Sequence, residues 1–300
     1  MNNSRFKKLN IGDTIGIISP SGNIKGEEKN VQVAIDFFKK RGFKIKIGDC
    51  FNKKTYSSSG TRYERVKEIN KMFADSEVRV IFCTIGGDTA NQVIDLIDYS
   101  LIKKNPKPII GFSDNTHLLI AINKKTGIKT FHGPNLSTIS NLTKDSLEQM
   151  FNVLSGKIFD TDFFSECDVI KEGKTRGLLI GGNLLIINAL NKTEFSPDYK
   201  DKILFWEDID EGLSDIEYQL YQLHLSGILG KISGMIIGHI ENPSKDSRPF
   251  REIVLELTKE HNYPILKTDC FGHGIEKFYT FPIGSEVKID TDKKFFTFSS

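Results

Sequence analysis

The sequence of 300 residues lacks both a long apolar run and a marked excess of charge of either sign. Its 41 lysine and arginine residues nearly balance its 39 aspartate and glutamate residues, which leaves a net charge of +2. Because so small a net charge gives no long-range attraction for nucleic acid or for an anionic membrane surface, we expect neither as a partner. A small molecule is then the default ligand. The chain is long enough for two domains, each with its own core.

The sequence also has few cysteines and no CxxC pair. The four cysteines are far apart, at Cys50, Cys83, Cys167 and Cys270. This spacing argues against a zinc knuckle and against a disulfide framework, so we expect reduced and mostly buried thiols.

A targeting segment is missing as well. Residues 1–13, MNNSRFKKLNIGD, include basic residues but not the apolar stretch of a signal peptide, and no later segment approaches the length of a transmembrane helix. We therefore expect a cytoplasmic protein. The sequence has no internal repeat and no low-complexity segment.

What the first half does contain is an alternation of apolar runs with segments of helical periodicity. Residues 15–19 and 78–85 are largely apolar runs that predict buried strands, and apolar residues recur every three or four positions between them. A further helix is predicted to include residues 93–97. Such an alternation is typical of a mostly parallel sheet covered by helices on both faces, with ligand sites at the carboxyl ends of the strands.

A polar stretch of weaker periodicity, residues 155–174, interrupts this alternation, and we expect a domain boundary there. The predicted fold class is α/β, with an N-terminal parallel-sheet α/β domain over residues 1–160. A smaller, mixed and strand-rich C-terminal domain follows over residues 161–300. Its last segments alternate apolar and polar residues, as antiparallel strands do.

The segment 106–116, PKPIIGFSDNT, is a candidate nucleophile turn. An apolar run reaches a glycine, and Ser113 then precedes a segment of helical periodicity. A serine on a sharp turn between a buried strand and a helix has its hydroxyl exposed beside backbone N–H groups, which is what acyl transfer needs. A serine followed by an aspartate is also a common helix N-cap, and the spacing by itself favours the cap.

A pair of glycines, Gly86 and Gly87, directly follows the apolar run 78–85. Glycines let a backbone approach a ligand closely, and their N–H groups can receive a phosphate or an oxyanion. The alternatives are a tight turn and the phosphate loop of a nucleotide kinase. In such a GGDG loop the last glycine is expected where Thr89 stands here.

Two of the six histidines, His132 and His273, stand beside glycine just after apolar runs. Glycine neighbours allow a histidine to be presented into a cleft, as a catalytic base must be, although either could instead make a structural hydrogen bond. The residues alone do not choose between them.

A base also needs an ionised carboxylate to orient it, and Glu207 ends the apolar strand 203–207. A carboxylate there is costly unless it has a partner, although an acidic surface loop is the alternative. Glu207, Asp208 and Asp210 with His239 could also bind a divalent ion. Their spacing matches no known ligand loop, so we expect no metal and no cofactor.

Taken together, these segments resemble a known family over nearly the whole chain. The resemblance is carried by motifs that occur in family order: IISPSG (17–22), IGGDTAN (85–91), NPKPIIGFSDNTHLL (105–119), FHGP (131–134), GLLIGGNL (177–184), ILFWED (203–208), GILGKISGMIIG (227–238) and FGHGIEKFYTFPIG (271–284). The sequence is similar to the LD-carboxypeptidase family of serine peptidases, which includes murein tetrapeptide carboxypeptidases and microcin C self-immunity proteins.

The resemblance implies a Ser-Glu-His triad between two domains, usually in a homodimer. By motif, Ser113 in GFSD is the nucleophile, Glu207 in LFWED the orienting acid and His273 in GHG the base. The backbone N–H groups of Gly87 and Asp114 are the implied oxyanion donors, and Asp114 is expected to act chiefly through that N–H. The resemblance thus favours His273 over His132.

The implied activity is a metal-independent serine carboxypeptidase that hydrolyses an LD peptide bond in a muropeptide or related small peptide, in peptidoglycan recycling. The alternative substrate is a peptidyl or aminoacyl nucleotide, because residues 211–218 have Ser214 and Tyr218 where the murein-type pattern E-x-P-Y-x-x-D-R has its Tyr and Arg. Alternatives of other classes are a nucleotide-binding kinase and a binding module without turnover. Four further residues are candidates for substrate binding: Gly86, Asn91, His132 and Arg176. Arg176 would hold a terminal carboxylate, and ordinary surface charge is the alternative for it.

Overall fold

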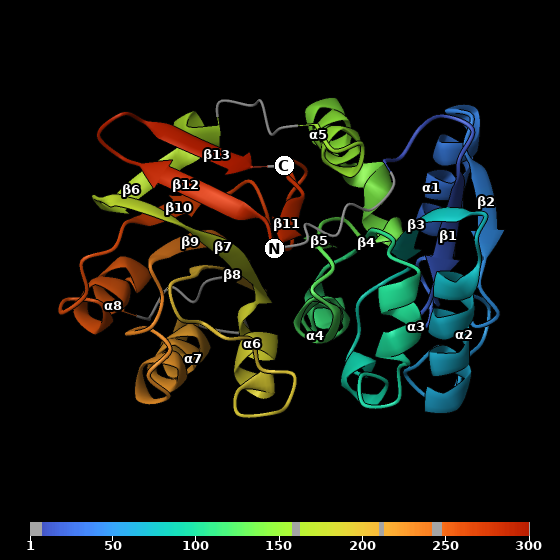
Figure 1. Ribbon diagram of the computed structural model, residues 1–300, viewed down its shortest axis with the longest axis horizontal. Helices are drawn as coiled ribbons and strands as arrows, with labels where there is room; N and C mark the ends of the chain where they lie inside the picture. The colour runs from blue at the N-terminus through green and yellow to red at the C-terminus, as the bar shows by residue number, and fades with distance from the viewer. Residues whose placement is uncertain (1–7, 158–162, 210–212, 242–247, 300) are drawn as a thin grey trace. The chain divides into compact units, whose positions relative to one another are not determined.

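The computed structural model describes residues 8–157, 163–209, 213–241 and 248–299, which divide into two compact units (Figure 1). The first unit comprises Met1–Lys157 and Thr280–Gly284, and the second Ile158–Tyr279 and Ser285–Ser300. The segment Thr280–Gly284 therefore lies in the first unit, although it falls within the residue range of the predicted second domain. Each unit is built around its own sheet, and the predicted α/β fold class is confirmed.

The described strands of the first unit form a six-stranded sheet in the order β11-β5-β4-β3-β1-β2. The strands are β1 (Thr14–Ile18), β2 (Lys44–Ile47), β3 (Val78–Cys83), β4 (Ile109–Gly111), β5 (Thr130–His132) and β11 (Phe281–Ile283). Neighbours among β1 to β5 pair in parallel, as the alternation of apolar runs predicts, whereas β11 pairs antiparallel with β5.

The helices of the first unit follow from local sequence signals. They are α1 (Glu28–Lys40), α2 (Arg62–Ala74), α3 (Tyr99–Lys104), α4 (Thr116–Thr126) and α5 (Lys144–Leu154), with the short 3-10 helices η1 (Ala90–Gln92), η2 (Ser113–Asn115) and η3 (Leu136–Asn141). Thr61 and Glu64 form a capping box that starts α2. The predicted helix over residues 93–97 is wrong. The chain makes turns there because the side chain of Asp98 caps the next helix by accepting the N–H of Leu101, 2.9 Å away.

The described strands of the second unit form a seven-stranded sheet in the order β13-β12-β7-β8-β9-β10-β6. The strands are β6 (Cys167–Lys171), β7 (Lys174–Asn183), β8 (Ile203–Ile209), β9 (Gly234–Glu241), β10 (Ile265–Thr268), β12 (Glu286–Asp290) and β13 (Phe295–Ser299). The central strands β7 to β10 are parallel, while β6, β12 and β13 run antiparallel to their neighbours, so the sheet is mixed as predicted. The helices are η4 (Phe163–Glu166), α6 (Leu184–Leu190), α7 (Leu213–Leu225) and α8 (Phe250–Leu257).

Buried aromatic side chains join the layers within each unit. In the first unit the rings of Phe38 on α1 and Phe82 on β3 lie 5.0 Å apart between centroids. In the second, Phe205 on β8 meets Phe271, which follows β10, at 5.7 Å. Burial of such large side chains supplies much of the driving force for folding.

Two further expectations concern features of the whole sequence. All four cysteines are free thiols; three are buried and Cys167 is half-buried, as their spacing predicts. Among the described residues, no helix has both the length and the apolar character needed to cross a membrane.

Candidate active site

Ser113 lies at the turn where strand β4 passes into a helix. Phe112 is extended, Ser113 has a φ of +62°, and η2 begins at once and continues into α4. An L-residue is rarely found in this left-handed region, and such strain is concentrated at functional sites. Ser113 is not the N-cap of either helix, and neither N-cap residue has a side-chain capping hydrogen bond. The helix-cap interpretation is therefore wrong. A serine in the left-handed region between a strand and a helix is the arrangement that a nucleophile turn would require.

Of the two glycines that follow β3, Gly86 lies directly against Ser113, and Gly87 lies against Ser21 and Gly22. A Cβ atom built on Gly86 would be 3.0 Å from both Cβ and Oγ of Ser113. Gly87 has a φ of +140°, and a Cβ built on it would be 2.7 Å from Oγ of Ser21 and from the backbone N of Gly22. Both positions therefore need glycine for close approach, and Gly87 needs it for its φ as well. Within the described residues, the N–H of Gly87 has no hydrogen-bond acceptor.

The side chain of Asp114 has a structural role that the sequence did not indicate. Its carboxylate is buried and accepts the backbone N–H groups of Thr89, at 2.8 Å, and Ala90, at 2.7 Å. It also accepts the hydroxyl of Ser21 and lies 3.0 Å from Nδ1 of His117. Burial alone would raise the pKa of Asp114, but the hydrogen bonds from His117 and Ser21 outweigh it and lower that pKa below its usual range. The side chain therefore stays charged and holds the segment that follows the two glycines.

The other candidates of the first unit differ in exposure. His132 is fully buried at the end of β5, and its ring meets the ring of Phe112 edge-on with centroids 6.1 Å apart. Asn91 is exposed on η1, and Gly86 is buried beside Ser113. His132 thus packs behind the turn that carries Ser113.

The second unit holds a hydrogen-bonded acid and base. Glu207, near the end of β8, has no exposed surface, and its Oε2 lies 2.6 Å from Nδ1 of His273. The His273 side chain is 12% exposed. With Nδ1–H donating to the carboxylate, Nε2 is left as the basic nitrogen. Glu207 and His273 therefore form the orienting pair that a general base needs.

Packing and glycine geometry fix the loop that carries His273. Phe271 packs on Phe205, and its carbonyl accepts the N–H of His239 at 2.8 Å. Gly272 and Gly274 on either side of the histidine have φ values of +130° and +69°. A Cβ on Gly274 would come within 2.6 Å of Oε1 of Glu241. The glycine neighbours are thus required for the imidazole to lie where it does.

Acidic neighbours set the protonation of this pair. Burial lowers the pKa of His273, but the charges of Glu207, Glu241 and Asp208 outweigh it, so the pKa is raised above its ordinary value. Burial and the charge of Glu207 raise the pKa of Asp208 to about 7. Asn183 donates to Asp208 over 2.9 Å, a contact that sequence reasoning missed. The sequence carries no signal for this contact, because it depends on the register of β7 and β8, which sets Asn183 opposite Glu207.

Two further expectations concern Arg176 and Asp210. The guanidinium of Arg176 is 2.8 Å from Glu286 on the neighbouring strand, and its side chain is 64% exposed, as ordinary surface charge would be. Asp210, one of the considered metal ligands, lies outside the described residues. Within the part of the chain that the structure describes, no group of three or more His, Cys, Asp or Glu residues could hold a metal ion.

The predicted site residues thus form two groups. Ser113, Gly86, Gly87 and Asp114 are brought together in the first unit, with His132 and Asn91 on the same unit. Glu207 and His273 are brought together in the second, and Arg176 lies on the same unit, paired with Glu286 on strand β12.

Comparison with known proteins assigns both halves of the chain to one family. Residues 15–133 match the LD-carboxypeptidase N-terminal domain, and residues 176–289 match the LD-carboxypeptidase C-terminal domain. The probable murein peptide carboxypeptidase of Bacillus subtilis is 33% identical over 97% of this chain and 93% of its own length. The microcin C7 self-immunity protein MccF of Escherichia coli is 31% identical over 95% of this chain and 93% of its own.

The fold gives the same result. The solved structure of MccF in complex with glutamyl sulfamoyl guanosine has a TM-score of 0.91 to this chain, at 28% identity, and the match covers 98% of each chain. These matches confirm the resemblance that the motifs indicate.

Proposed function

We propose that this chain, which belongs to the LD-carboxypeptidase family, is a serine carboxypeptidase that hydrolyses an LD peptide bond in a muropeptide or a related small peptide. The observation that carries the proposal is the left-handed conformation of Ser113 at a strand-to-helix turn that packs against Gly86. The next residue, Gly87, has an N–H without an acceptor among the described residues. Such a turn exposes a hydroxyl and places N–H donors beside it, as acyl transfer requires.

In the proposed mechanism, Oγ of Ser113 attacks the carbonyl carbon of the scissile bond and its proton passes to Nε2 of His273. Glu207 keeps the imidazole oriented through Nδ1 and stabilises the imidazolium that forms. The N–H groups of Gly87 and Asp114 receive the negative charge that develops on the carbonyl oxygen.

The tetrahedral intermediate then collapses. The C–N bond breaks, and the leaving amine takes the proton from His273. A water molecule, deprotonated by the same histidine, attacks the acyl-enzyme, and the peptide acid leaves as Ser113 regains its proton. The first unit supplies the nucleophile and the N–H donors, and the second supplies the acid–base pair. The mechanism therefore requires the two groups to act on one substrate.

The direct test is Ser113→Ala, assayed on a muropeptide mixture with mass spectrometry of the released amino acid. We expect a loss of roughly 10³-fold or more in kcat, because no other hydroxyl takes the place of the nucleophile. Ser140→Ala is a matched control, since Ser140 is exposed on η3 of the same unit. Retention of the hydrolytic rate by Ser113→Ala would refute the mechanism.

The alternatives of other classes make different predictions in the same assay. A nucleotide kinase that used Gly86 and Gly87 would need ATP and Mg²⁺ and would tolerate the loss of His273. Hydrolysis that survives a chelator and disappears in His273→Ala would exclude it. A binding module would show saturable binding of the muropeptide without product.

A peptidyl or aminoacyl nucleotide is the second candidate substrate. The observation in its favour is the likeness to MccF, whose solved complexes contain glutamyl sulfamoyl guanosine and aspartyl sulfamoyl adenosine. The identities of 31% to MccF and 33% to the murein carboxypeptidase are too similar to separate the two substrates. Incubation with an equimolar mixture of a muropeptide and an aminoacyl sulfamoyl adenosine separates them, because the released groups differ in mass.

The wider setting is also proposed from the family resemblance. We place the enzyme in peptidoglycan recycling in the cytoplasm, and we expect a homodimer. Sedimentation equilibrium of the purified chain measures the oligomeric state, and a monomer at micromolar concentration would contradict it.

A further inference from the structure

Buried charged groups bind both the backbone N–H and the backbone carbonyl of Thr89. The Asp114 carboxylate accepts its N–H at 2.8 Å, and the Arg65 guanidinium donates to its carbonyl oxygen at 2.9 Å and to its hydroxyl at 3.1 Å. Asp114 is 4% exposed and Arg65 is not exposed at all. Hydrogen bonds to charged groups are about twice as strong as neutral ones, so these contacts hold the backbone of Thr89 strongly in place.

Arg65 holds backbone and amide groups where an ion pair would be expected. It donates to the carbonyl of Pro20 at 2.7 Å and to the side chain of Gln92 at 2.8 Å. Among the described residues no carboxylate lies within ion-pair distance of it. Arginine is rarely fully buried without such a pair, since the loss of hydration is costly. The buried guanidinium here joins the segment after β1 to the segment after β3.

A second set of contacts joins the same two segments close to Ser113. The hydroxyl of Ser21 donates to the Asp114 carboxylate. The N–H of Gly22 donates to the carbonyl of Gly86 at 2.9 Å, and Gly87 fits against Ser21 with no room for a Cβ. The segment 86–90 is therefore fixed at its start by residues 21 and 22 and at its end by Asp114 and Arg65.

We propose that the carboxylate of Asp114, with Arg65 opposite it, is a positioning group that sets the distance between the two backbone N–H donors of the oxyanion site. Asp114 supplies one donor through its own N–H, and its side chain holds the segment that carries the other, at Gly87. The inference rests on the proposed function, since the donors matter for catalysis if Ser113 is acylated.

The size of the expected effect follows from the geometry that an oxyanion needs. Its donors must lie about 2.7–3.1 Å from the oxygen, and a misplacement of about 1 Å can cost roughly 10²-fold in rate. Asp114→Asn keeps the shape of the side chain and removes the charge that attracts two N–H groups. We expect kcat to fall about 10²-fold with little change in KM, because the oxyanion exists in the transition state and not in the bound substrate.

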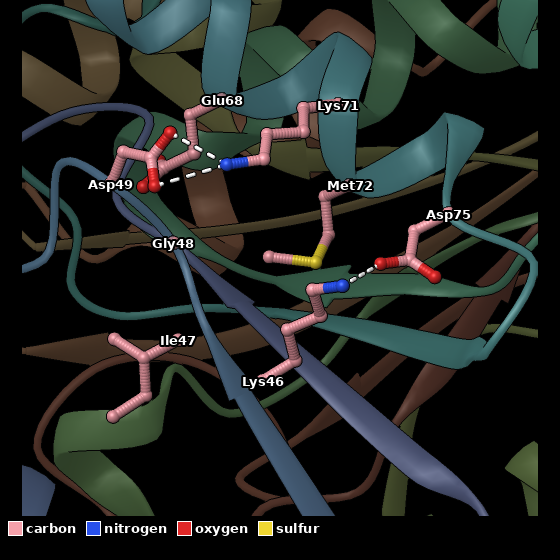
Figure 2. Close-up of a pocket in the computed structure, with 8 residues that line it drawn as sticks. All are labelled: Lys46, Ile47, Gly48, Asp49, Glu68, Lys71, Met72 and Asp75. Carbon is pink, nitrogen blue, oxygen red and sulfur yellow. Dashed lines mark hydrogen bonds and ion pairs between the residues drawn. The ribbon is translucent and has the colours of Figure 1, made fainter.

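Glu68→Gln is the matched control. Glu68 is a second buried carboxylate of the same unit, 2% exposed, and it accepts the backbone N–H groups of Ser19 at 2.8 Å and Cys50 at 2.7 Å. Figure 2 shows Glu68 among the residues that line a pocket, together with residues 46–49, Lys71, Met72 and Asp75. Glu68 makes no hydrogen bond to residues 86–90. Glu68→Gln should lower stability as Asp114→Asn does, while kcat per folded molecule stays at the wild-type value.

Amide hydrogen exchange gives a measurement that does not depend on catalysis. The N–H groups of Thr89 and Ala90 should exchange faster in Asp114→Asn than in the wild type, and at the wild-type rate in Glu68→Gln. If Asp114→Asn does not fold, Ser21→Ala takes its place. That variant removes one hydrogen bond to the carboxylate and should lower kcat several-fold at unchanged KM.

The outcomes separate the two proposals. A folded Asp114→Asn or Ser21→Ala with the kcat of Glu68→Gln, or with unchanged exchange at Thr89 and Ala90, would overturn the positioning role. An inactive Ser113→Ala together with either of these results would overturn this inference alone. A fully active Ser113→Ala would overturn the proposed function and this inference with it.

Discussion

The two groups of candidate residues use different physical means. The candidate group of the first unit is defined by backbone conformation: a serine at φ +62°, a glycine at φ +140° and N–H groups held in place by hydrogen bonds. The candidate group of the second unit is defined by charge: a buried Glu207, a histidine paired with it, and Asp208 beside them. The pKa shifts also differ between the two groups. The pKa of Asp114, in the first group, is lowered, whereas the pKa values of His273 and Asp208, in the second, are raised. The first group should therefore be sensitive to added atoms, and the second to changes of charge and pH.

The largest effect is expected from removing the charge of the second group without changing its shape. Glu207→Gln should lower kcat roughly 10³- to 10⁴-fold, because the amide no longer favours the tautomer of His273 that has its basic nitrogen at Nε2. Steady-state kinetics on a muropeptide measures it. Glu172→Gln, at an exposed position of the same unit, should keep the wild-type rate. If kcat of Glu207→Gln were within tenfold of the wild-type value, the second group would not depend on charge as proposed.

An added methyl group in the first group should also lower activity, through steric strain instead of a change of charge. Gly87→Ala introduces a Cβ at φ +140° and only 2.7 Å from the backbone N of Gly22, so the segment 86–90 must move. We expect a loss of about 1–3 kcal/mol in the free energy of unfolding, measured with urea, and a fall in kcat of about 10²-fold.

A second glycine-to-alanine change, Gly127→Ala, separates the effect of a positive φ from the effect of a steric clash. Gly127 also has a positive φ, +74°, but a Cβ there meets nothing within 4 Å. Gly127→Ala should thus cost about 1 kcal/mol in stability and leave kcat unchanged. Equal kinetic effects of the two alanines would contradict the view that the close fit of Gly87 against Ser21 and Gly22 matters for activity.

The pH dependence of activity should report the second group. The pKa of His273 is raised above the ordinary 6.5, so kcat/KM should fall on the acid side of a pKa above that value, where the base becomes protonated. The linked stability has the opposite sense. It is fully present below 6.5 and is lost as pH rises through the raised pKa.

A substitution of Glu241 tests whether the acid limb of the pH profile belongs to His273. Glu241 is one of the charges that raise the pKa of His273, and Glu241→Gln should move the acid limb of the profile to lower pH. Asp114→Asn should lower the whole profile without moving the limb. A limb that moves in Asp114→Asn and stays in Glu241→Gln would reverse the assignment of roles.

The smallest effect is expected at Arg176, whose guanidinium is paired with Glu286 at the surface. An exposed ion pair contributes little, so Arg176→Ala should leave kcat, KM and the melting temperature close to the wild-type values. An increase in KM of tenfold or more would instead assign the terminal carboxylate of the substrate to Arg176.

Local patterns in the sequence were sufficient for several features of the fold and the site. The apolar runs predicted parallel strands in the first unit, and the glycines after one of those runs lie where the backbone packs closely against other segments. The order of the motifs indicated the family, which the family matches confirm. For Ser113, however, local spacing favoured a helix cap, because a cap and a nucleophile turn share the same residue types.

What the sequence determined by itself is the alternation of elements, the position of each motif at a strand end and the family. The tertiary structure alone decided which groups meet, because the partners are far apart along the chain. Glu207 and His273 are 66 positions apart, and Ser21 and Asp114 are 93 apart. Periodicity records which face of an element is buried, but it carries no information on the partner across the fold. Two features are therefore visible only in the folded structure. The Asp114 carboxylate binds the N–H groups of Thr89 and Ala90, and the segment Thr280–Gly284 pairs with the sheet of the first unit.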